Sequence, residues 1–341
     1  MDNSFFILSK PQTAVSSFQM CTWDLGNDDN GFVEMGMEMA GNGGDTIELL
    51  LWLPFLSAGC SVSDLYGVIS RDDKTSRFVF DDRVIGSEPV DGDRSMGVNI
   101  TFEQYGRVTL LPVSHIETDT ARRCVCLQCR VPQSAASRLY VRILIGAGVP
   151  TISNLHKGIS KSTYLYDIKI NQRRNMPDDI SRIVGQGYGI SEVEECVCMH
   201  IVPNMYDIAF VDGNMLTGIR TLESRFFDIF LPNTRGIDKD GYMIVTNRST
   251  TRQGHAFFTV FAKETIGSKQ VFFAIGANML CSVLFAIGAI RNTITSEIRL
   301  LQQIPLEYWI AIGMLVAVVV VFFGGRIKIP WLRGRKLTIK I

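Results

Sequence analysis

The sequence is poor in the residues and motifs that mark common enzymes. It has only four histidines among 341 residues, and they are scattered at His115, His156, His200 and His255. It contains no GxSxG nucleophile elbow, no HExxH zinc motif, no phosphate-binding P-loop and no protein-kinase motif set. Nothing in these patterns indicates catalysis, so we expect a non-enzymatic protein that needs no cofactor.

The chain also lacks a net charge, but its two signs are unevenly distributed. Positions 269–341 hold nine basic and two acidic residues, which leaves 25 basic and 32 acidic residues, a formal charge of −7, in positions 1–268. A general nucleic-acid-binding protein needs a basic face to neutralise phosphates. The acidic front of the chain therefore argues against that class.

Charge is absent altogether from residues 271–290, VFFAIGANMLCSVLFAIGAI. A helix of this length spans about 30 Å, the thickness of the hydrocarbon core of a bilayer. A second uncharged run, residues 309–325, lies near Tyr308, Trp309 and Trp331, which are residue types of membrane interfaces. The pattern predicts a transmembrane hairpin with helices at 270–290 and 308–325. Two buried helices of a soluble core are the alternative.

Flanking charges predict the orientation of this hairpin. The tail, residues 326–341, has six basic and no acidic residues, whereas the connector, residues 291–307, has two of each sign. Basic flanks stay on the cytoplasmic side. We therefore expect a multi-pass protein of the inner or plasma membrane, with an external connector and with both its N-terminal region and its tail in the cytoplasm. Residues 1–12 show no secretory signal, and a reducing cytosol would keep the eight cysteines as thiols.

Strand signals dominate residues 15–265. Short runs rich in Val, Ile, Phe and Tyr are separated by turn residues, which predicts a β-sandwich or a pair of them. A Gly- and Pro-containing stretch at 146–158 suggests a boundary between β-domains at 1–149 and 159–265. One helix is expected at 177–184, with an aspartate as N-cap and Gly185 at its end. The expected strands are 47–55, 76–80, 97–102, 107–113, 122–131, 138–145, 162–170, 194–202, 206–211, 224–231, 241–246 and 255–262.

Two cysteine clusters contain residue types that bind zinc. They comprise Cys124, Cys126 and Cys129 in one run, and Cys196, Cys198 and His200 in another. On a strand, however, Cys129 would point away from the other two of its run, and alternate residues lie about 7 Å apart, too far for neighbouring ligands of one ion. The alternative is that they are small buried residues of paired strands.

The most basic stretch of the first 268 residues is 157–174, where two tyrosines are interleaved with cations. Such a mixture is suited to an anionic ligand such as a nucleotide second messenger. It is equally typical of the solvated face of a strand, or of a surface that touches anionic lipid. The candidate ligand-binding residues are Lys157, Lys161, Lys169, Arg173 and Arg174.

One amide interrupts the first apolar run. Ala274, Asn278, Ser282 and Ala286 recur every four residues and would form one seam along a helix. In the second run, Gly313 and Ala317 form a pair of small residues with the same spacing. Small and polar residues bring membrane helices together or face water inside a bundle. The seam therefore predicts helix packing, within one hairpin or between copies, or the lining of a pore.

This layout is similar to that of bacterial antiviral defence effectors, in which a cytosolic sensing domain is joined to a few transmembrane helices. The resemblance implies a sensor that forms homo-oligomers and perturbs or permeabilises the membrane. Its partners would be the lipid bilayer, further copies of the chain, and an anionic small molecule or a protein. A non-catalytic scaffold subunit anchored by the hairpin is the first alternative, and a membrane-held zinc enzyme is the second.

Overall fold

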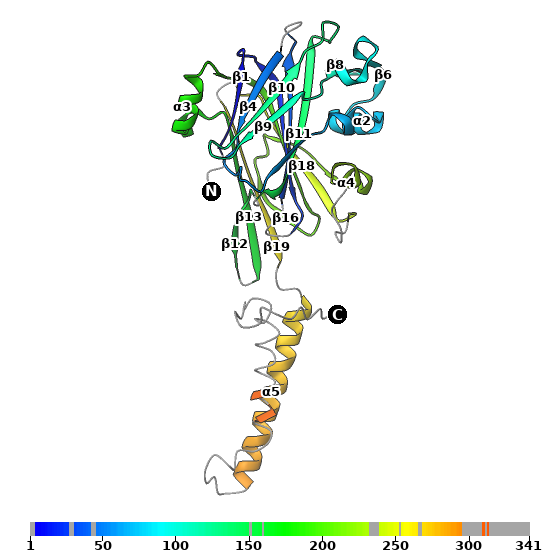
Figure 1. Cartoon of the computed structure of the whole chain (residues 1–341). Helices are drawn as coiled ribbons and strands as arrows, with labels where there is room; N and C mark the ends of the chain where they lie inside the picture. The colour runs from blue at the N-terminus through cyan, green and yellow to red at the C-terminus, as the bar shows by residue number, and fades with distance from the viewer. Residues whose placement is uncertain are drawn as a thin grey trace. The chain divides into compact units, whose positions relative to one another are not determined.

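The computed structural model of the chain describes residues 4–26, 31–41, 46–149, 152–158, 160–231, 239–251, 254–264, 268–294, 309–310 and 312–313. The chain is mainly β and divides into two compact units. The first comprises residues 1–158 and 162–263, and the second comprises residues 159–161 and 264–341. Figure 1 shows the strands of the first unit and the long helix of the second.

Nine of the described strands form one sheet, called sheet 1 here, in the order β16-β19-β13-β1-β4-β10-β9, with β12 beside β13 and β14 beside β1. Most neighbours in this sheet run antiparallel, but β1 and β13 pair in parallel. Its strands are β1 (Ser4–Lys10), β4 (Thr46–Trp52), β9 (His115–Asp119), β10 (Cys124–Arg130), β12 (Asn154–Lys157), β13 (Lys161–Ile170), β14 (Gly189–Ile190), β16 (Asp207–Val211) and β19 (His255–Glu264).

Ten further strands form sheet 2, in the order β17-β18-β15-β2-β3-β11-β8-β7-β6, with β5 beside β11. Its strands are β2 (Val15–Asp24), β3 (Gly31–Ala40), β5 (Ser61–Asp64), β6 (Val84–Pro89), β7 (Val98–Phe102), β8 (Gly106–Leu110), β11 (Arg138–Val149), β15 (Val193–Pro203), β17 (Leu216–Thr221) and β18 (Tyr242–Ser249). Parallel pairs join β2 to β15 and β8 to β11.

The main hydrophobic core lies between the two sheets. Alternate residues of β2, such as Phe18 and Met20, meet alternate residues of β4, such as Leu49 and Leu51, in one buried cluster. Because the side chains of a strand point alternately to its two faces, each sheet offers one complete apolar face to this core. The predicted mainly β architecture is therefore confirmed.

The strands on either side of the expected domain boundary are not separated into two β-domains. Strand β1 pairs with β13, and β2 pairs with β15 along eight residue pairs. Each sheet thus contains strands from both 1–149 and 159–265. The physical reason is that the apolar faces of the two segments complete one shared core, so the stretch 146–158 connects strands of a single unit.

Short helices cover the outer faces of the sheets (Figure 1). Helices α1 (Tyr66–Ile69), α2 (Asp73–Phe80) and α4 (Ser224–Phe230) contribute to a second buried cluster with outward-facing residues of sheet 2. The strand predictions at 76–80 and 224–231 are therefore wrong. In α4, Phe226, Phe227 and Phe230 are all buried, and this spacing places them on one helical face rather than on one strand face.

The predicted helix at 177–184 is confirmed as α3 (Asp178–Val184). Its N-cap residue is Pro177, not an aspartate, and no side chain caps it. Gly185 is the C-cap residue, as expected. Ile180 and Ile183 of α3 pack in a third cluster on the outer face of sheet 1.

The second unit contains α5 (Ser268–Ile294), which includes the uncharged run 271–290. Among the described residues, no helix combines the length and the mean hydropathy required of a membrane-spanning segment. Of the second uncharged run, only residues 309–310 and 312–313 are described, and they are helical. The tail 326–341, residues 295–307 of the connector and Ala317 lie outside the described residues.

Candidate ligand-binding cavity

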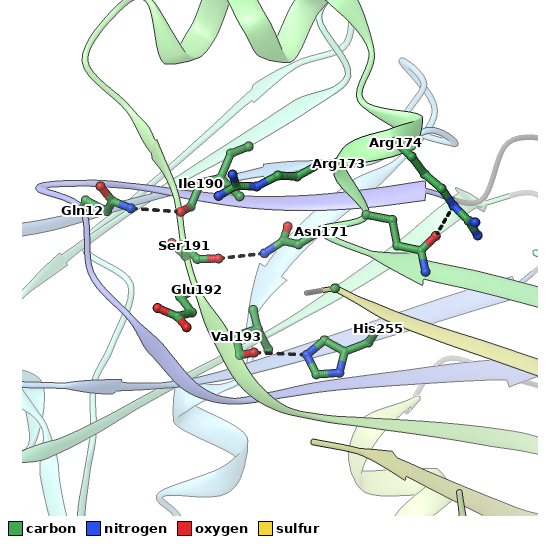
Figure 2. A pocket seen from close by; sticks show the side chains of 11 residues that line it. Gln12, Asn171, Arg173, Arg174, Ile190, Ser191, Glu192, Val193 and His255 are labelled. Carbon is green, nitrogen blue, oxygen red and sulfur yellow. Dashed lines mark hydrogen bonds between the residues drawn. The ribbon is translucent and has the colours of Figure 1, made fainter. Parts of the chain in front are cut away.

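A polar cavity of about 740 Å³ lies where the chain leaves sheet 1 for sheet 2. After β13, residues 171–192 form a 3₁₀ turn (Arg173–Asn175), α3 and β14 before β15 begins in the other sheet. This excursion leaves a hollow beside the ends of β13 and β19 (Figure 2). Its lining residues are Gln12, Asn171, Gln172, Arg173, Arg174, Ile190, Ser191, Glu192, Val193, Gly254 and His255.

Asn171 holds the wall of the cavity together. Its backbone is left-handed, with φ of 52°, which asparagine tolerates better than most residues. Its Oδ1 accepts a hydrogen bond from the Ile7 amide at 2.8 Å, and its Nδ2 donates to the Ser191 carbonyl at 2.9 Å. Facing it, Gly254 has φ of 94°, and a Cβ there would lie 2.9 Å from the Asn171 carbonyl oxygen. The wall therefore requires both residues.

His255 is a second fixed part of the wall. Its Nε2 donates to the Val193 carbonyl at 3.2 Å, and its Nδ1 lies 3.0 Å from the Ser249 hydroxyl. Since the carbonyl can only accept, the neutral ring carries its proton on Nε2, and Nδ1 accepts from Ser249. Burial lowers the pKa of His255, and the hydrogen bond to Val193 opposes that shift. Both ring nitrogens of His255 are thus hydrogen-bonded to groups of the protein itself.

The positive charge of the cavity comes from two arginines on the 3₁₀ turn. Arg173 extends towards Ile190, whereas Arg174 points the other way and donates from Nε to Gln172 Oε1 at 3.2 Å (Figure 2). Both are exposed, and neither forms an ion pair with any residue that the structure describes. Glu192 is the one acidic residue of the lining. The guanidinium of Arg173 is therefore available to an anion.

Of the five basic residues predicted to bind a ligand, the cavity brings together only Arg173 and Arg174. Lys169 lies on β13, and its Nζ is 2.6 Å from Asp167 Oδ2. Lys157 ends β12 and Lys161 begins β13. None of these three lysines lines the cavity. Lys161 and Lys169 belong to the alternate residues of β13 that are exposed or half-buried, whereas the residues between them are buried.

The two cysteine clusters lie on different sheets, with Cys124, Cys126 and Cys129 on β10 of sheet 1 and the others on β15 of sheet 2. As the alternation of a strand requires, Cys124 packs on the outer face and Cys129 in the inter-sheet core. Among the described residues, no three His, Cys, Asp or Glu side chains gather as ligands of one metal ion. Burial raises the pKa of the Cys124 and Cys129 thiols to about 12.

His200 is fully buried in the sandwich. Its Nδ1 lies 2.8 Å from Thr22 Oγ1, and its Nε2 lies 3.7 Å from Cys198 Sγ. Its ring is 4.5 Å from that of Tyr166, measured between centroids. Burial lowers the pKa of His200 to about 3, so the ring is neutral at physiological pH. These contacts satisfy the imidazole within the core.

The seam residues Ala274, Asn278, Ser282 and Ala286 all lie on α5, where a spacing of four places them along one face. The Ser282 hydroxyl donates to the Asn278 carbonyl at 2.9 Å, a bond within the helix. Gly313 lies in the short described part of the second run. Packing of this seam, or a pore lined by it, stays a prediction.

Sequence reasoning missed two ion pairs on sheet 2, one of which is buried. Arg142 pairs with Glu34 at 2.6 Å, and both side chains are under 5% exposed. Arg138 pairs with Glu38 at 2.7 Å. Each of these two residues lies four positions from its counterpart in the first pair, on the same two strands, β3 and β11. The matching spacing of two acids on β3 and two arginines on β11 was the available signal, because residues four apart on a strand share a face.

No family model matches this chain, and no curated protein matches it. Among solved structures, it is similar to an M1 zinc metallopeptidase from Deinococcus radiodurans, with 11% sequence identity and a TM-score of 0.29. The similarity covers 75% of this chain and 43% of that protein, so the chain spans less than half of its length. At this TM-score the similarity supports no argument about fold or activity.

Proposed function

We propose that this protein is a non-catalytic recognition protein whose β-sandwich binds an anionic ligand and whose C-terminal helical region associates with a lipid bilayer. The observation that carries the proposal is the series of exposed large apolar side chains along α5. A stable water-exposed protein surface rarely keeps so many large apolar side chains together. The assignment to bacterial defence effectors stays a prediction from the order of the segments.

Helix α5 exposes large apolar residues along its described length. Phe273 and Val283 are each 57% exposed, and Met279 is 66% exposed. The other exposed members are Val271, Ile275, Leu280, Phe285 and Ile287. The sequence provides no charged residue between 271 and 290. A lipid bilayer is an environment in which such an uncharged helix is stable.

The short tether between the units supports a role for both. Strand β19 ends at Glu264 and α5 begins at Ser268, so only three residues separate a strand of sheet 1 from the helix. The proposed ligand-binding part and the proposed lipid-associated part are thus joined by a short stretch of chain. The cavity supplies the recognition site in this proposal. Arg173 lines it, extends towards Ile190 and has no ion-pair partner among the described residues.

The buried thiols and imidazoles support a non-catalytic role. Cys196, Cys198 and His200 lie in the core, and burial raises the pKa of both thiols. A thiol is a poor nucleophile when its pKa is raised. His255 lines the cavity, but both of its ring nitrogens are already hydrogen-bonded to the protein.

Membrane fractionation of the full chain tests the proposal. We expect the protein to stay with the membranes after an alkaline carbonate wash, and to be released when Phe273→Asp and Val283→Asp add two charges to α5. A matched control places the same two charges at Ile85 and Ile219, which are exposed residues of the sandwich, and this variant should stay membrane-bound. Release of the unaltered protein by carbonate would overturn the lipid association.

The effect on the membrane is tested separately with a potential-sensitive dye in expressing cells. Depolarisation that is lost in Asn278→Leu would support assembly through the seam of α5. Expression that leaves the membrane potential unchanged while the protein remains carbonate-resistant would favour the scaffold role, in which the helical region only anchors the sandwich.

A further inference from the structure

A second cavity adjoins the polar one. It has a volume of about 430 Å³ and shares Gln12, Arg173 and Ile190 with the first cavity as lining residues. Its remaining lining residues are Met176, Ser181, Val184 and Gly189. The polar cavity, by contrast, is lined by amides, charged groups and an imidazole. The two hollows therefore differ in chemistry on the two sides of Arg173.

Two apolar side chains of the second cavity are partly exposed to solvent. Met176, which precedes α3, is 38% exposed, and Val184, the last residue of α3, is 40% exposed. The inner face of the same helix is buried. That inner face is formed by Ile180 and Ile183. Ser181 and Val184 are one turn apart on a different face of α3 and border the cavity. Met176 and Val184 thus give the second cavity an apolar surface that is partly open to solvent.

Arg173 stands at the junction of the two cavities, and its guanidinium has no ion-pair partner among the described residues. A guanidinium offers a planar fork of donors that matches a carboxylate or a phosphate. Gln12, on the opposite side of the junction, uses its Nε2 to bind the Ile190 carbonyl at 3.2 Å. This bond holds together two of the residues that line both cavities.

We infer that the two adjoining cavities bind one anionic amphiphile, a carboxylate or phosphate monoester that carries an alkyl or acyl chain. The oxyanion pairs with Arg173 in the polar cavity, and the chain packs against Met176, Val184 and Ile190. A flexible methionine suits a chain of variable shape. This inference rests on the recognition role proposed above and specifies the class of its ligand.

A nucleotide fits the two cavities less well. Base recognition commonly uses stacking on an aromatic side chain, and the lining residues of both cavities include no Phe, Tyr or Trp. The imidazole of His255 is 1% exposed and cannot offer a face for stacking. The lining of the two cavities therefore favours a ligand with an apolar chain, and a nucleotide second messenger stays a prediction from the sequence.

A series of alkyl phosphates tests the inference on the full chain in phosphatidylcholine nanodiscs. Binding of inorganic phosphate, methyl, butyl and octyl phosphate is measured by calorimetry against protein-free nanodiscs. We expect affinity to rise about two- to fourfold for each buried methylene group. Sodium octanoate should follow octyl phosphate, since the inference requires the oxyanion and not phosphorus.

Three variants separate the head from the chain. Arg173→Met should weaken every member of the series at least tenfold. The double variant Met176→Ser and Val184→Ser should leave methyl phosphate unchanged and flatten the dependence on chain length. The matched control is Arg182→Met, because Arg182 is an arginine of α3 that is 78% exposed and lines neither cavity, and this variant should bind like the unaltered protein.

Each contrary outcome identifies what fails. Equal binding of methyl and octyl phosphate would overturn the amphiphile while leaving anion recognition in place. An equal loss in Arg173→Met and Arg182→Met would show unspecific attraction and overturn the site. Binding of no member of the series would overturn both the ligand class and the recognition role, whereas the carbonate result alone decides the lipid association. Competition by phosphatidic acid in the nanodisc would identify the bilayer as the source of the ligand.

Discussion

At the scale of single residues, the sandwich holds several polar groups that are buried and fully partnered. His200 lies between the sheets with Thr22 and Cys198 as partners. On the other face of sheet 2, Arg142 is bonded to Glu34, Gln19 and Tyr140. Gly36 leaves room for this network, since a Cβ there would overlap the Tyr140 hydroxyl. The free energy of unfolding should therefore depend on pH through His200 and on the presence of Glu34 through Arg142.

His200 should make the folded state sensitive to acid. Burial lowers its pKa to about 3 in the folded protein, whereas an unfolded chain protonates histidine near pH 6.5. Below that pH only the unfolded state takes up the proton, so stability is lost as pH falls from about 6.5 towards 3. Between pH 7.5 and 5 the loss from this one group is about 2 kcal/mol.

Urea titrations at both pH values check this expectation. In His200→Gln the drop in unfolding free energy between pH 7.5 and 5 should be about 2 kcal/mol smaller than in the unaltered protein. The comparison of slopes, rather than of absolute stabilities, removes the cost of the substitution itself. Parallel pH profiles for the two proteins would show that His200 is protonated in the folded state.

Glu34 and Arg142 should be costly to separate. Glu34→Gln leaves a buried guanidinium without its countercharge, and loss of one partner of a buried pair costs about 3–5 kcal/mol. The control is Glu103→Gln, which alters an exposed pair with 3.9 Å between Arg83 Nη1 and Glu103 Oε2 and should cost less than about 1 kcal/mol. Equal unfolding free energies for the two variants in urea would contradict this account.

At the scale of elements, the sequence indicates most strands but not the helices that cover them. The strand runs are recognisable because β-branched and aromatic residues cluster between turns, as in 162–170, which is part of β13. The segment 224–231 contains the same residue types, and only the positions of Phe226, Phe227 and Phe230 distinguish its helix. Seven or eight residues are too few for composition alone to separate the two periodicities.

The cavity was less predictable than the strands, for a topological reason. Arg173 and Arg174 are visible as a basic pair, but Gln12, Asn171 and His255 are distant in sequence and meet only because β1, β13 and β19 are neighbours in sheet 1. Likewise, the sharing of sheets by the two halves of the chain depends on the parallel pairs β1–β13 and β2–β15. Such long-range pairings leave no local signal.

Helix α4 should be held mainly by Phe227. This side chain is fully buried, and its ring lies 5.5 Å from that of Trp23 and 5.3 Å from that of Tyr242. Phe227→Ala should lower the unfolding free energy by about 3–5 kcal/mol, because it removes apolar contacts and leaves a cavity. Arg225→Ala, on the exposed side of the same helix, should cost less than about 1 kcal/mol in the same urea titration. Similar losses would mean that α4 does not cover the sheet.

At the scale of the whole molecule, the core of the sandwich is complete before α5 begins. The four buried hydrophobic clusters of the described residues draw on residues from Phe5 to Phe261, and none includes a residue of α5. The last strand, β19, contributes Phe257 to the inter-sheet cluster and Phe261 to the cluster around Tyr166. The end of β19 is thus the point at which the first unit has all of its core.

Two truncations therefore give opposite expected results. A chain that ends at Glu264 should be water-soluble and should unfold cooperatively by circular dichroism, because it retains every residue of the four clusters.

A chain that ends at Gly254 differs by ten residues but lacks β19, so sheet 1 loses the strand between β13 and β16 and the core loses Phe257 and Phe261. Two buried phenylalanines are together worth more than about 6 kcal/mol, which is comparable to the whole stability of a domain, so this chain should not fold. If the chain ending at Glu264 also failed to fold, α5 would have to supply part of the core, and its exposed apolar residues would need a protein partner rather than lipid.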